Sequence, residues 1–177
     1  MKKKILISPI ILFFLILLVF FYLLIIDRNP SELPSVLINK KVPTFEAKLL
    51  LENKTFISPG EFRNETTLVN FFATWCKPCF DEHRYLKKLS DEKGLTIIGI
   101  NYKDNSKRTI KWLEKLGNPY SNVLLDPNAS LGIDWGVYGL PETFIVNSKG
   151  MIKYRLVGPI TKKNYDAFVL KVKEVEK

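Results

Sequence analysis

The sequence predicts an α/β domain in which a mixed β-sheet carries helices on both faces. Three observations predict it. Strand-like apolar runs and helix-like segments alternate from residue 67 onward. The first of these runs leads directly into a Cys-x-x-Cys motif and a helical pattern, which indicates a strand-to-helix junction. Near the C-terminus two strand-like runs flank a tight turn and precede a closing helix, so the order reads βαβ, then α, then ββα.

The N-terminal segment predicts a membrane anchor. Residues 1–4 are a methionine and three lysines, and the 22 residues at 5–26 carry no charge. A helix of that length spans roughly 33 Å, which is enough for a bilayer core. A cleaved signal peptide is the alternative, but its apolar region is typically about 7–15 residues long, and positions 25–29 offer no small-x-small cleavage site. We expect a cytoplasmic tail at 1–4, an uncleaved transmembrane anchor at 5–26 and a domain outside the cytoplasm.

Residues 27–35 are expected to form a linker, and residues 36–177 are one domain's worth of chain. The net charge of the chain is +9, but the lysines are scattered rather than grouped. This pattern favours a solvated basic surface over nucleic-acid binding. Outside the cytoplasm an exposed dithiol tends to become oxidised, so a reducing role there requires a supply of electrons.

The elements of the domain follow from local patterns. A small hairpin is expected from residues 44–51 and 54–57. After it we expect strands at 67–73, 95–100, 121–125, 142–146 and 151–157, helices at 80–93, 106–116 and 161–176, and a short helix or turn at 128–135. Ser106 is expected to cap its helix, which Gly117 and Pro119 stop. The turn at 147–150 joins the last two strands.

Cys76 and Cys79 are the only cysteines in the chain. At the start of a helix, unpaired backbone N–H groups and the positive end of the helix dipole favour a thiolate over a thiol. The pair can therefore cycle between a dithiol and a disulfide. We expect Cys76, which comes first, to be the exposed nucleophile beside the charge of Lys77, and Cys79 to be the more buried resolving thiol. A purely structural disulfide is disfavoured, because so short a loop constrains the unfolded chain little.

Metal and haem sites are the alternative uses of such a pair. A structural zinc site takes four ligands, and the chain has no second Cys pair. His83 completes a Cys-x2-Cys-x3-His spacing, so a three-ligand metal site remains an alternative. Covalent haem attachment requires a histidine directly after the second cysteine, where this chain has Phe80.

Several motifs carry a family resemblance. The run 69–79 resembles the active-site segment of thioredoxin-fold proteins, and 139–144 resembles their cis-proline loop. More specific similarity to the CcmG/DsbE family, membrane-anchored thiol:disulfide oxidoreductases of cytochrome c maturation, comes from Cys79–His83, Asn101–Asp104, Lys111–Tyr120 and Gly136–Phe144. It covers roughly residues 35–165. Lys77-Pro78 replaces the Pro-Thr that is frequent between the cysteines of that family, and Leu140 replaces a common Ala.

The resemblance implies a thioredoxin-like fold, with the mixed sheet and flanking helices preceded by the transmembrane helix. It also implies a cis bond before Pro141, which would present the backbone of Leu140 to an extended substrate strand. Trp75 is expected at the rim of the active site. Pro78 is expected to stiffen the motif from within the first helical turn.

Two acidic residues are candidates for tuning the cysteines. Asn70 stands where ordinary thioredoxins have a buried aspartate, so a carboxylate from Glu82 or Glu142 takes that role in our interpretation. A negative charge nearby raises a thiol pKa. The alternative is that Glu82 lies on a solvated helix surface and has no effect on the cysteines. Glu142 is expected at the rim of the active site. His83 is expected to pack or form hydrogen bonds more than to act as a base.

By resemblance, the function is reduction of the Cys-x-x-Cys-His segment of apocytochrome c, or of a thiol carrier for it. A DsbD- or CcdA-type membrane protein would supply electrons, and the catalytic domain would lie in the periplasm, anchored to a bacterial inner membrane. No metal, haem or nucleotide cofactor is implied. The alternatives are a general periplasmic disulfide oxidant or isomerase and, less favoured, a copper-binding thioredoxin-fold chaperone. Such chaperones have Cys-x-x-x-Cys and a distant histidine, unlike this chain.

Overall fold

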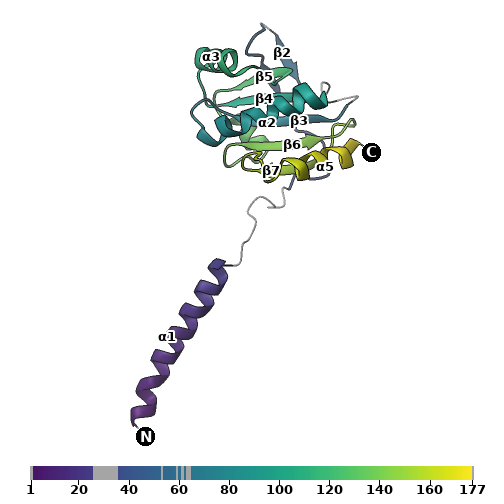
Figure 1. Cartoon of the computed structure of the whole chain (residues 1–177). Helices are drawn as coiled ribbons and strands as arrows, with labels where there is room; N and C mark the ends of the chain where they lie inside the picture. The colour runs from purple at the N-terminus through teal and green to yellow at the C-terminus, as the bar shows by residue number, and fades with distance from the viewer. Residues whose placement is uncertain are drawn as a thin grey trace. The chain divides into compact units, whose positions relative to one another are not determined.

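The computed structural model describes residues 2–25, 36–52, 54–58, 60, 62 and 65–176 (Figure 1). The chain divides into two units, Met1–Pro30 and Ser31–Lys177. In the first, α1 (Lys2–Ile25) is a single helix whose side chains are described over 9–23. Within the described part of the chain, no helix has the length and apolar character needed to cross a membrane. The expected linker at 27–35 and the last residue of the expected anchor, 26, lie outside the described residues.

A five-stranded mixed sheet forms the second unit, in the order β5-β4-β3-β6-β7. Its strands are β3 (Thr67–Phe72), β4 (Thr96–Tyr102), β5 (Asn122–Asp126), β6 (Glu142–Val146) and β7 (Ile152–Val157). The first three run parallel to one another, whereas β6 pairs antiparallel with both β3 and β7. The predicted mixed sheet is confirmed. Every residue of the central strand β3 is buried, because both faces of the sheet are covered.

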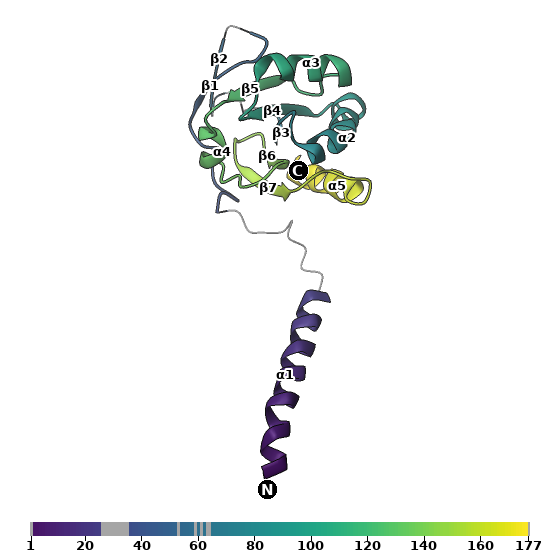
Figure 2. The same ribbon diagram turned by 90° about the vertical axis from the view of Figure 1, so that its left-hand side faces the viewer.

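Different elements cover the two faces of the sheet. The helices are α2 (Lys77–Lys93), α3 (Ser106–Leu116), α4 (Ser130–Asp134) and α5 (Tyr165–Glu176), and the hairpin consists of β1 (Glu46–Lys48) and β2 (Thr55–Ile57). Figure 2 shows α2, α3 and α5 on one face, and α4 with the hairpin on the other. Alternate residues of β3 point to opposite faces, so Leu68 and Phe72 join one core cluster, and Val69 and Phe71 join the other.

The start of α2 differs from the sequence prediction. This helix begins at Lys77 rather than at residue 80. Cys76 is its N-cap, and the Cys76 Sγ accepts a hydrogen bond of 3.1 Å from the backbone N–H of Cys79. Pro78 fits the first turn, where a backbone N–H has no partner within the helix. Both cysteines and the proline therefore belong to the helix start itself.

Two other helix starts were also mispredicted. Asn105, not Ser106, caps α3, because its Oδ1 accepts a hydrogen bond of 3.2 Å from the N–H of Arg108. The last helix begins at Tyr165 rather than at Thr161. The residues between form a turn, in which the Oδ1 of Asn164 accepts a hydrogen bond of 2.6 Å from the N–H of Thr161.

Candidate active site

Cys76 and Cys79 form a disulfide at the junction of β3 and α2, with their Cα atoms 5.3 Å apart. Cys76 is 5% exposed and Cys79 is 1% exposed. Both residues are buried in this oxidised form, so the expectation that Cys76 is exposed was wrong for this form. The N-cap position places the Cys76 Sγ against the backbone N–H of Cys79. That N–H is one of the donors that would stabilise a Cys76 thiolate.

The residues on either side of Cys76 face solvent. Trp75 is 55% exposed, and its indole Nε1 donates a hydrogen bond of 3.1 Å to the carbonyl oxygen of Lys103. The Nζ of Lys77 lies 2.6 Å from the Oδ1 of Asp81, one turn along the helix. Both side chains of this pair are more than half exposed. The charge of Lys77 is thus shared with an exposed carboxylate.

The loop before β6 contains the expected cis peptide bond, between Leu140 and Pro141. Glu142, the next residue, pairs with Phe71 of β3 in the sheet register, so this loop lies at the edge where β3 enters the Cys motif. Leu140 packs against the core cluster that contains both cysteines. Neither the N–H nor the C=O of Leu140 forms a hydrogen bond with another described residue. A peptide strand can therefore pair with this backbone.

Glu82 is fully buried, so the alternative prediction, that it lies on a solvated helix surface, was wrong. Its Oε1 accepts a hydrogen bond of 2.9 Å from Asn70 Nδ2, and its Oε2 accepts one of 3.0 Å from the N–H of Ile160. Burial raises the pKa of Glu82 to about 8, and these two hydrogen bonds only partly oppose it. Glu82 lies three residues after Cys79 and therefore on the same face of α2.

Asn70 connects this acid to the rest of the core. Its Nδ2 also donates to the Oγ1 of Thr143 at 3.0 Å, and its Oδ1 accepts a hydrogen bond of 3.0 Å from the hydroxyl of Tyr120. Burial, with the charge of Glu82 as a second cause, raises the pKa of Tyr120 well above its ordinary value. The phenol therefore stays protonated and can donate. The network is neutral whenever Glu82 holds its proton.

Glu142 is also buried, which corrects its expected position at the rim. Its Oε2 accepts from Arg155 Nε at 2.7 Å, and its Oε1 accepts from the N–H groups of Tyr138 and Gly139 at 3.2 and 3.3 Å. Burial raises the pKa of Glu142 above its ordinary value, although Arg155 opposes the shift. Arg155 also donates to the carbonyl oxygen of Gly136 at 2.9 Å. The pair therefore holds together the loop that precedes the cis bond.

His83 is a packing residue, as the sequence suggested. Its Nε2 donates to the carbonyl oxygen of Gly117 at 2.8 Å, and its ring lies edge-on to Trp112 with the centroids 4.3 Å apart. Burial lowers the pKa of His83, so the ring is neutral near pH 7. The described residues contain no group of three or more His, Cys, Asp and Glu side chains arranged to hold a metal ion.

A surface groove lies beside the motif. It has a volume of about 550 Å³ and is lined in part by Pro78, Tyr85 and Ile160. The basic residues Arg84 and Lys163 also line it. Because Pro78 lies between the two cysteines, the groove borders the Cys-x-x-Cys motif.

The sequence interpretation did not identify three contributors to the site. Arg155 pairs with Glu142, Tyr120 completes the network around Asn70, and Asp104 contacts the residues just before Cys76. A helical spacing gave one signal that could have revealed the buried acid. Cys79, Glu82, His83, Leu86 and Leu89 follow the repeat of a single helix face, and that face is buried.

The arrangement is suited to two-electron exchange. A disulfide at a helix N-terminus can be opened by a thiolate, and the neighbouring N–H groups stabilise the sulfur that becomes charged. A carboxyl group with a pKa near 8 can hold or take up a proton close to neutral pH.

Comparison with known proteins supports this reading. Residues 37–169 match the Redoxin family. The chain is 50% identical over 131 residues to the thiol:disulfide interchange protein DsbE of Haemophilus influenzae, covering 74% of this chain and 72% of that protein. It is 38% identical over 172 residues to the DsbE of Escherichia coli K12, covering 90% and 88%. The thiol:disulfide interchange protein CycY of Rhizobium leguminosarum is 42% identical over 134 residues, covering 76% and 72%.

Solved structures show the same fold. A thiol:disulfide interchange protein of the thioredoxin family from Chlorobium tepidum superposes with a TM-score of 0.65 at 22% identity, covering 82% of this chain and all of that one. A DsbF homologue from Corynebacterium diphtheriae gives a TM-score of 0.69 at 15% identity, covering 84% and 95%. The thioredoxin-like fold expected from the sequence is thus confirmed.

Proposed function

Because the chain belongs to the Redoxin family, among thiol:disulfide interchange proteins of the DsbE type, we propose that it reduces the haem-binding cysteines of apocytochrome c, or a thiol carrier that handles those cysteines. The general activity, thiol:disulfide exchange at a Cys-x-x-Cys pair, is that of the family. The observation that carries the proposed direction is the buried Glu82, on the same helix face as Cys79.

The reaction proceeds by two thiolate attacks. The Cys76 thiolate attacks one sulfur of the partner disulfide, so a mixed disulfide forms and a partner thiolate leaves. The Cys79 thiolate then attacks the Cys76 Sγ, which releases the second partner thiolate. The partner gains two electrons and two protons. The protein is left with the Cys76–Cys79 disulfide, the form that the structure contains.

Glu82 is the proposed proton acceptor for Cys79. The resolving thiol is 1% exposed and must lose its proton without direct help from water. An acid whose pKa is about 8 is partly ionised near neutral pH and can accept that proton. An ionised Glu82 also opposes the helix dipole and disfavours thiolates, which favours a reducing pair over an oxidising one.

Partner binding is proposed at the surface around Cys76. Leu140 would pair through its unused N–H and C=O with an extended peptide, beside the bond to Pro141. Trp75 offers an exposed aromatic face, and Pro78 fixes the backbone between the cysteines. Glu142 would act indirectly, through the loop that it holds with Arg155. Recognition would therefore depend mainly on the backbone, as suits a segment of variable sequence.

The proposed location is the periplasmic side of a bacterial inner membrane, with residues 5–26 as a single-pass anchor. The uncharged run in the sequence and the helical conformation of Lys2–Ile25 support this. In an oxidising compartment the pair must be reduced again after each turnover. A membrane electron carrier of the DsbD or CcdA type would donate the two electrons.

An oxidising role is the second candidate. The hydrogen bond from the N–H of Cys79 to the Cys76 Sγ favours the Cys76 thiolate, and a stabilised thiolate makes a disulfide pair more oxidising. The same geometry therefore supports a disulfide oxidant or isomerase if Glu82 has no effect on the pair.

The equilibrium redox potential of the Cys76–Cys79 pair distinguishes the two roles. A reductant is expected near −180 mV or lower, on the order of the value for protein disulfide isomerase, whereas about −120 mV would indicate an oxidant. The partner is tested by incubating the reduced protein with apocytochrome c that carries an oxidised Cys-x-x-Cys-His segment. Thiols on the apocytochrome should appear with the wild-type protein and not with Cys76→Ser. If the pair has a reducing potential but the protein transfers no electrons to apocytochrome c or to a thiol carrier, the proposed substrate is contradicted.

A further inference from the structure

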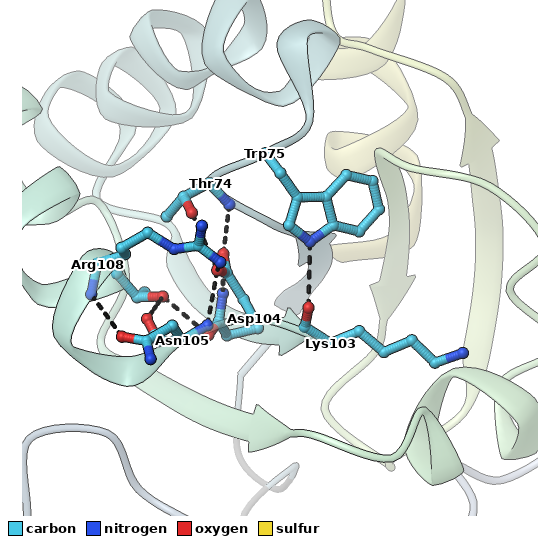
Figure 3. Close-up of polar contacts among 8 residues, drawn as sticks. Thr74, Trp75, Lys103, Asp104, Asn105 and Arg108 are labelled. Carbon is cyan, nitrogen blue, oxygen red and sulfur yellow. Dashed lines mark hydrogen bonds and ion pairs between the residues drawn. The ribbon is translucent and has the colours of Figure 1, made fainter.

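Two consecutive residues, Lys103 and Asp104, hold the backbone immediately before the nucleophile. Residues 73–76 connect β3 to α2 and belong to neither element. Within them, Thr74 bonds to Asp104, and Trp75 bonds to Lys103 (Figure 3). The sheet explains this arrangement, because Phe72 pairs with Asn101 in the parallel register of β3 and β4. Both strands therefore leave the sheet side by side at the same edge.

Both oxygens of the Asp104 carboxylate accept several hydrogen bonds. Its side chain has no exposed surface. Oδ2 accepts hydrogen bonds from the backbone N–H of Thr74 and from Asn101 Nδ2, the latter at 3.3 Å. Oδ1 accepts from Thr74 Oγ1 at 3.0 Å, from the N–H of Asn105 at 2.7 Å and from Arg108 Nη2 at 3.3 Å. Asp104 thus joins the turn before Cys76 to the start of α3.

Asp104 keeps its charge near neutral pH. Burial alone would raise its pKa, but the hydrogen bonds from Thr74, Asn105 and Asn101 together outweigh burial and hold the pKa below its ordinary value. An ionised carboxylate with every oxygen engaged neither donates a proton to a thiolate nor accepts one from a thiol. Its effect on the reaction therefore comes from its charge or from the geometry that it imposes, and only an effect of charge would move the pH midpoint of the Cys76 thiol.

Lys103 fixes the other half of the turn. Its φ of 45° lies in the left-handed region that a lysine rarely adopts. Its N–H donates to the carbonyl oxygen of Asp126 at 2.9 Å, and its own carbonyl oxygen accepts from Trp75 Nε1 at 3.1 Å. An exposed indole is thereby held at its polar end, while its apolar face remains open to a partner.

We propose that Asp104 is a positioning residue for thiol:disulfide exchange: through Thr74 it fixes the turn that presents the Cys76 sulfur and the Trp75 ring to the partner disulfide. A reacting sulfur must meet the partner disulfide in line, and a misplacement of about 1 Å can cost on the order of 100-fold in rate. This inference rests on the exchange reaction of the family and is independent of the partner proposed above.

The test measures attack by Cys76 alone. In the full chain carrying Cys79→Ser, the second-order rate of mixed-disulfide formation with glutathione disulfide is compared among variants at a temperature well below their melting points. Asp104→Ala should slow attack by about tenfold or more, with an unchanged pH midpoint for the Cys76 thiol. Asp104→Asn retains an acceptor for the Thr74 N–H and should recover most of the rate. Glutathione disulfide reports on positioning whether or not apocytochrome c is the natural partner.

A control and a second readout separate positioning from general stability. Arg108→Ala removes a donor whose side chain is 64% exposed and should leave the rate unchanged. Hydrogen exchange of the Trp75 indole N–H, assigned with Trp75→Phe, should accelerate in Asp104→Ala and not in Arg108→Ala. Equal rates and equal exchange in wild type and Asp104→Ala would overturn the proposal, as would an equal loss of rate in Arg108→Ala.

A variant with a smaller change covers the case in which Asp104→Ala does not fold. Thr74→Val removes the hydroxyl donor and keeps the backbone hydrogen bond to Asp104. Attack should then be slower than in wild type by a few-fold. If wild type, Asp104→Asn and Thr74→Val all attack at the same rate and show the same indole exchange, Asp104 does not position the nucleophile.

Discussion

The Nδ2 of Asn70 donates a hydrogen bond of 2.9 Å to the Oε1 of Glu82, and neither residue has any exposed surface. Among the described residues, the acid is thus buried with neutral hydrogen-bond partners and forms no ion pair. This environment explains the direction of its pKa shift, since burial disfavours the charged form and a neutral amide compensates only partly.

Glu82→Gln should change the pH dependence of stability. In the folded protein Glu82 keeps its proton up to about pH 8, whereas the unfolded chain releases it above about pH 4.5. The stabilisation from this group is therefore complete below pH 4.5 and is lost as the pH rises through 8, by at most about 1.4 kcal/mol per pH unit. Glutamine does not titrate, so the variant should lose that slope.

Denaturant unfolding at pH 5, 6, 7 and 8 measures this effect. Asp81→Asn is the matched control, because Asp81 lies next to Glu82 on the exposed side of α2. The control should keep the wild-type slope. If Glu82→Gln also keeps it, the carboxyl group does not titrate in this range and its proposed role with Cys79 fails.

Glu142→Gln should destabilise the fold. The substitution leaves Arg155, whose side chain is 6% exposed, without its anionic partner. Removal of one member of a buried ion pair costs about 3–5 kcal/mol. Adding Arg155→Met should recover much of that loss, because the remaining buried charge is then gone as well. A double variant as unstable as Glu142→Gln alone would contradict this explanation, as measured by urea unfolding.

Local patterns predicted the sheet and the redox pair because both depend on neighbours in sequence. β6 was predicted at 142–146 and is found there, since its apolar run ends at the Asn147–Gly150 turn. The same reasoning missed the burial of Glu82 and Glu142. A charged side chain is ordinarily exposed, and each of these acids is buried only because a distant partner meets it: Asn70 for one and Arg155 for the other.

Local sequence patterns also could not predict the contacts between residues at the ends of strands. Asp104 lies 30 residues from Thr74 in sequence, and their hydrogen bond depends on the register of β3 and β4. The predicted βαβ unit implied that both strands end at one edge of the sheet. It did not fix which residues meet there, because a shift of one residue in the pairing would exchange the faces.

The two cysteines should behave differently when replaced. Cys76→Ser removes the attacking sulfur and should abolish exchange. Cys79→Ser should still attack but then stall, so that the partner accumulates as a mixed disulfide. Non-reducing gel electrophoresis of each variant after incubation with oxidised apocytochrome c shows the difference. Trapping by Cys76→Ser and not by Cys79→Ser would reverse the assigned roles.

The resolving step should follow the titration of Glu82. If Glu82 accepts the proton of Cys79, resolution of the mixed disulfide should accelerate as the pH rises through about 8. In Glu82→Gln no carboxyl group remains to accept the proton of the Cys79 thiol, which is 1% exposed and has little direct access to water. The variant should therefore resolve more slowly than wild type at pH 7, and the two rates should converge in alkali.

Stopped-flow measurement separates this step from the first attack. A preformed mixed disulfide between Cys76 and a chromogenic thiol releases that thiol only when Cys79 attacks, so the absorbance reports resolution directly. Formation of the mixed disulfide, measured in the Cys79→Ser background, should not be slower in Glu82→Gln, because Cys76 keeps its stabilisation from the helix N-terminus and loses only an opposing charge. Resolution at the wild-type rate in Glu82→Gln at pH 7 would show that Cys79 loses its proton by another route.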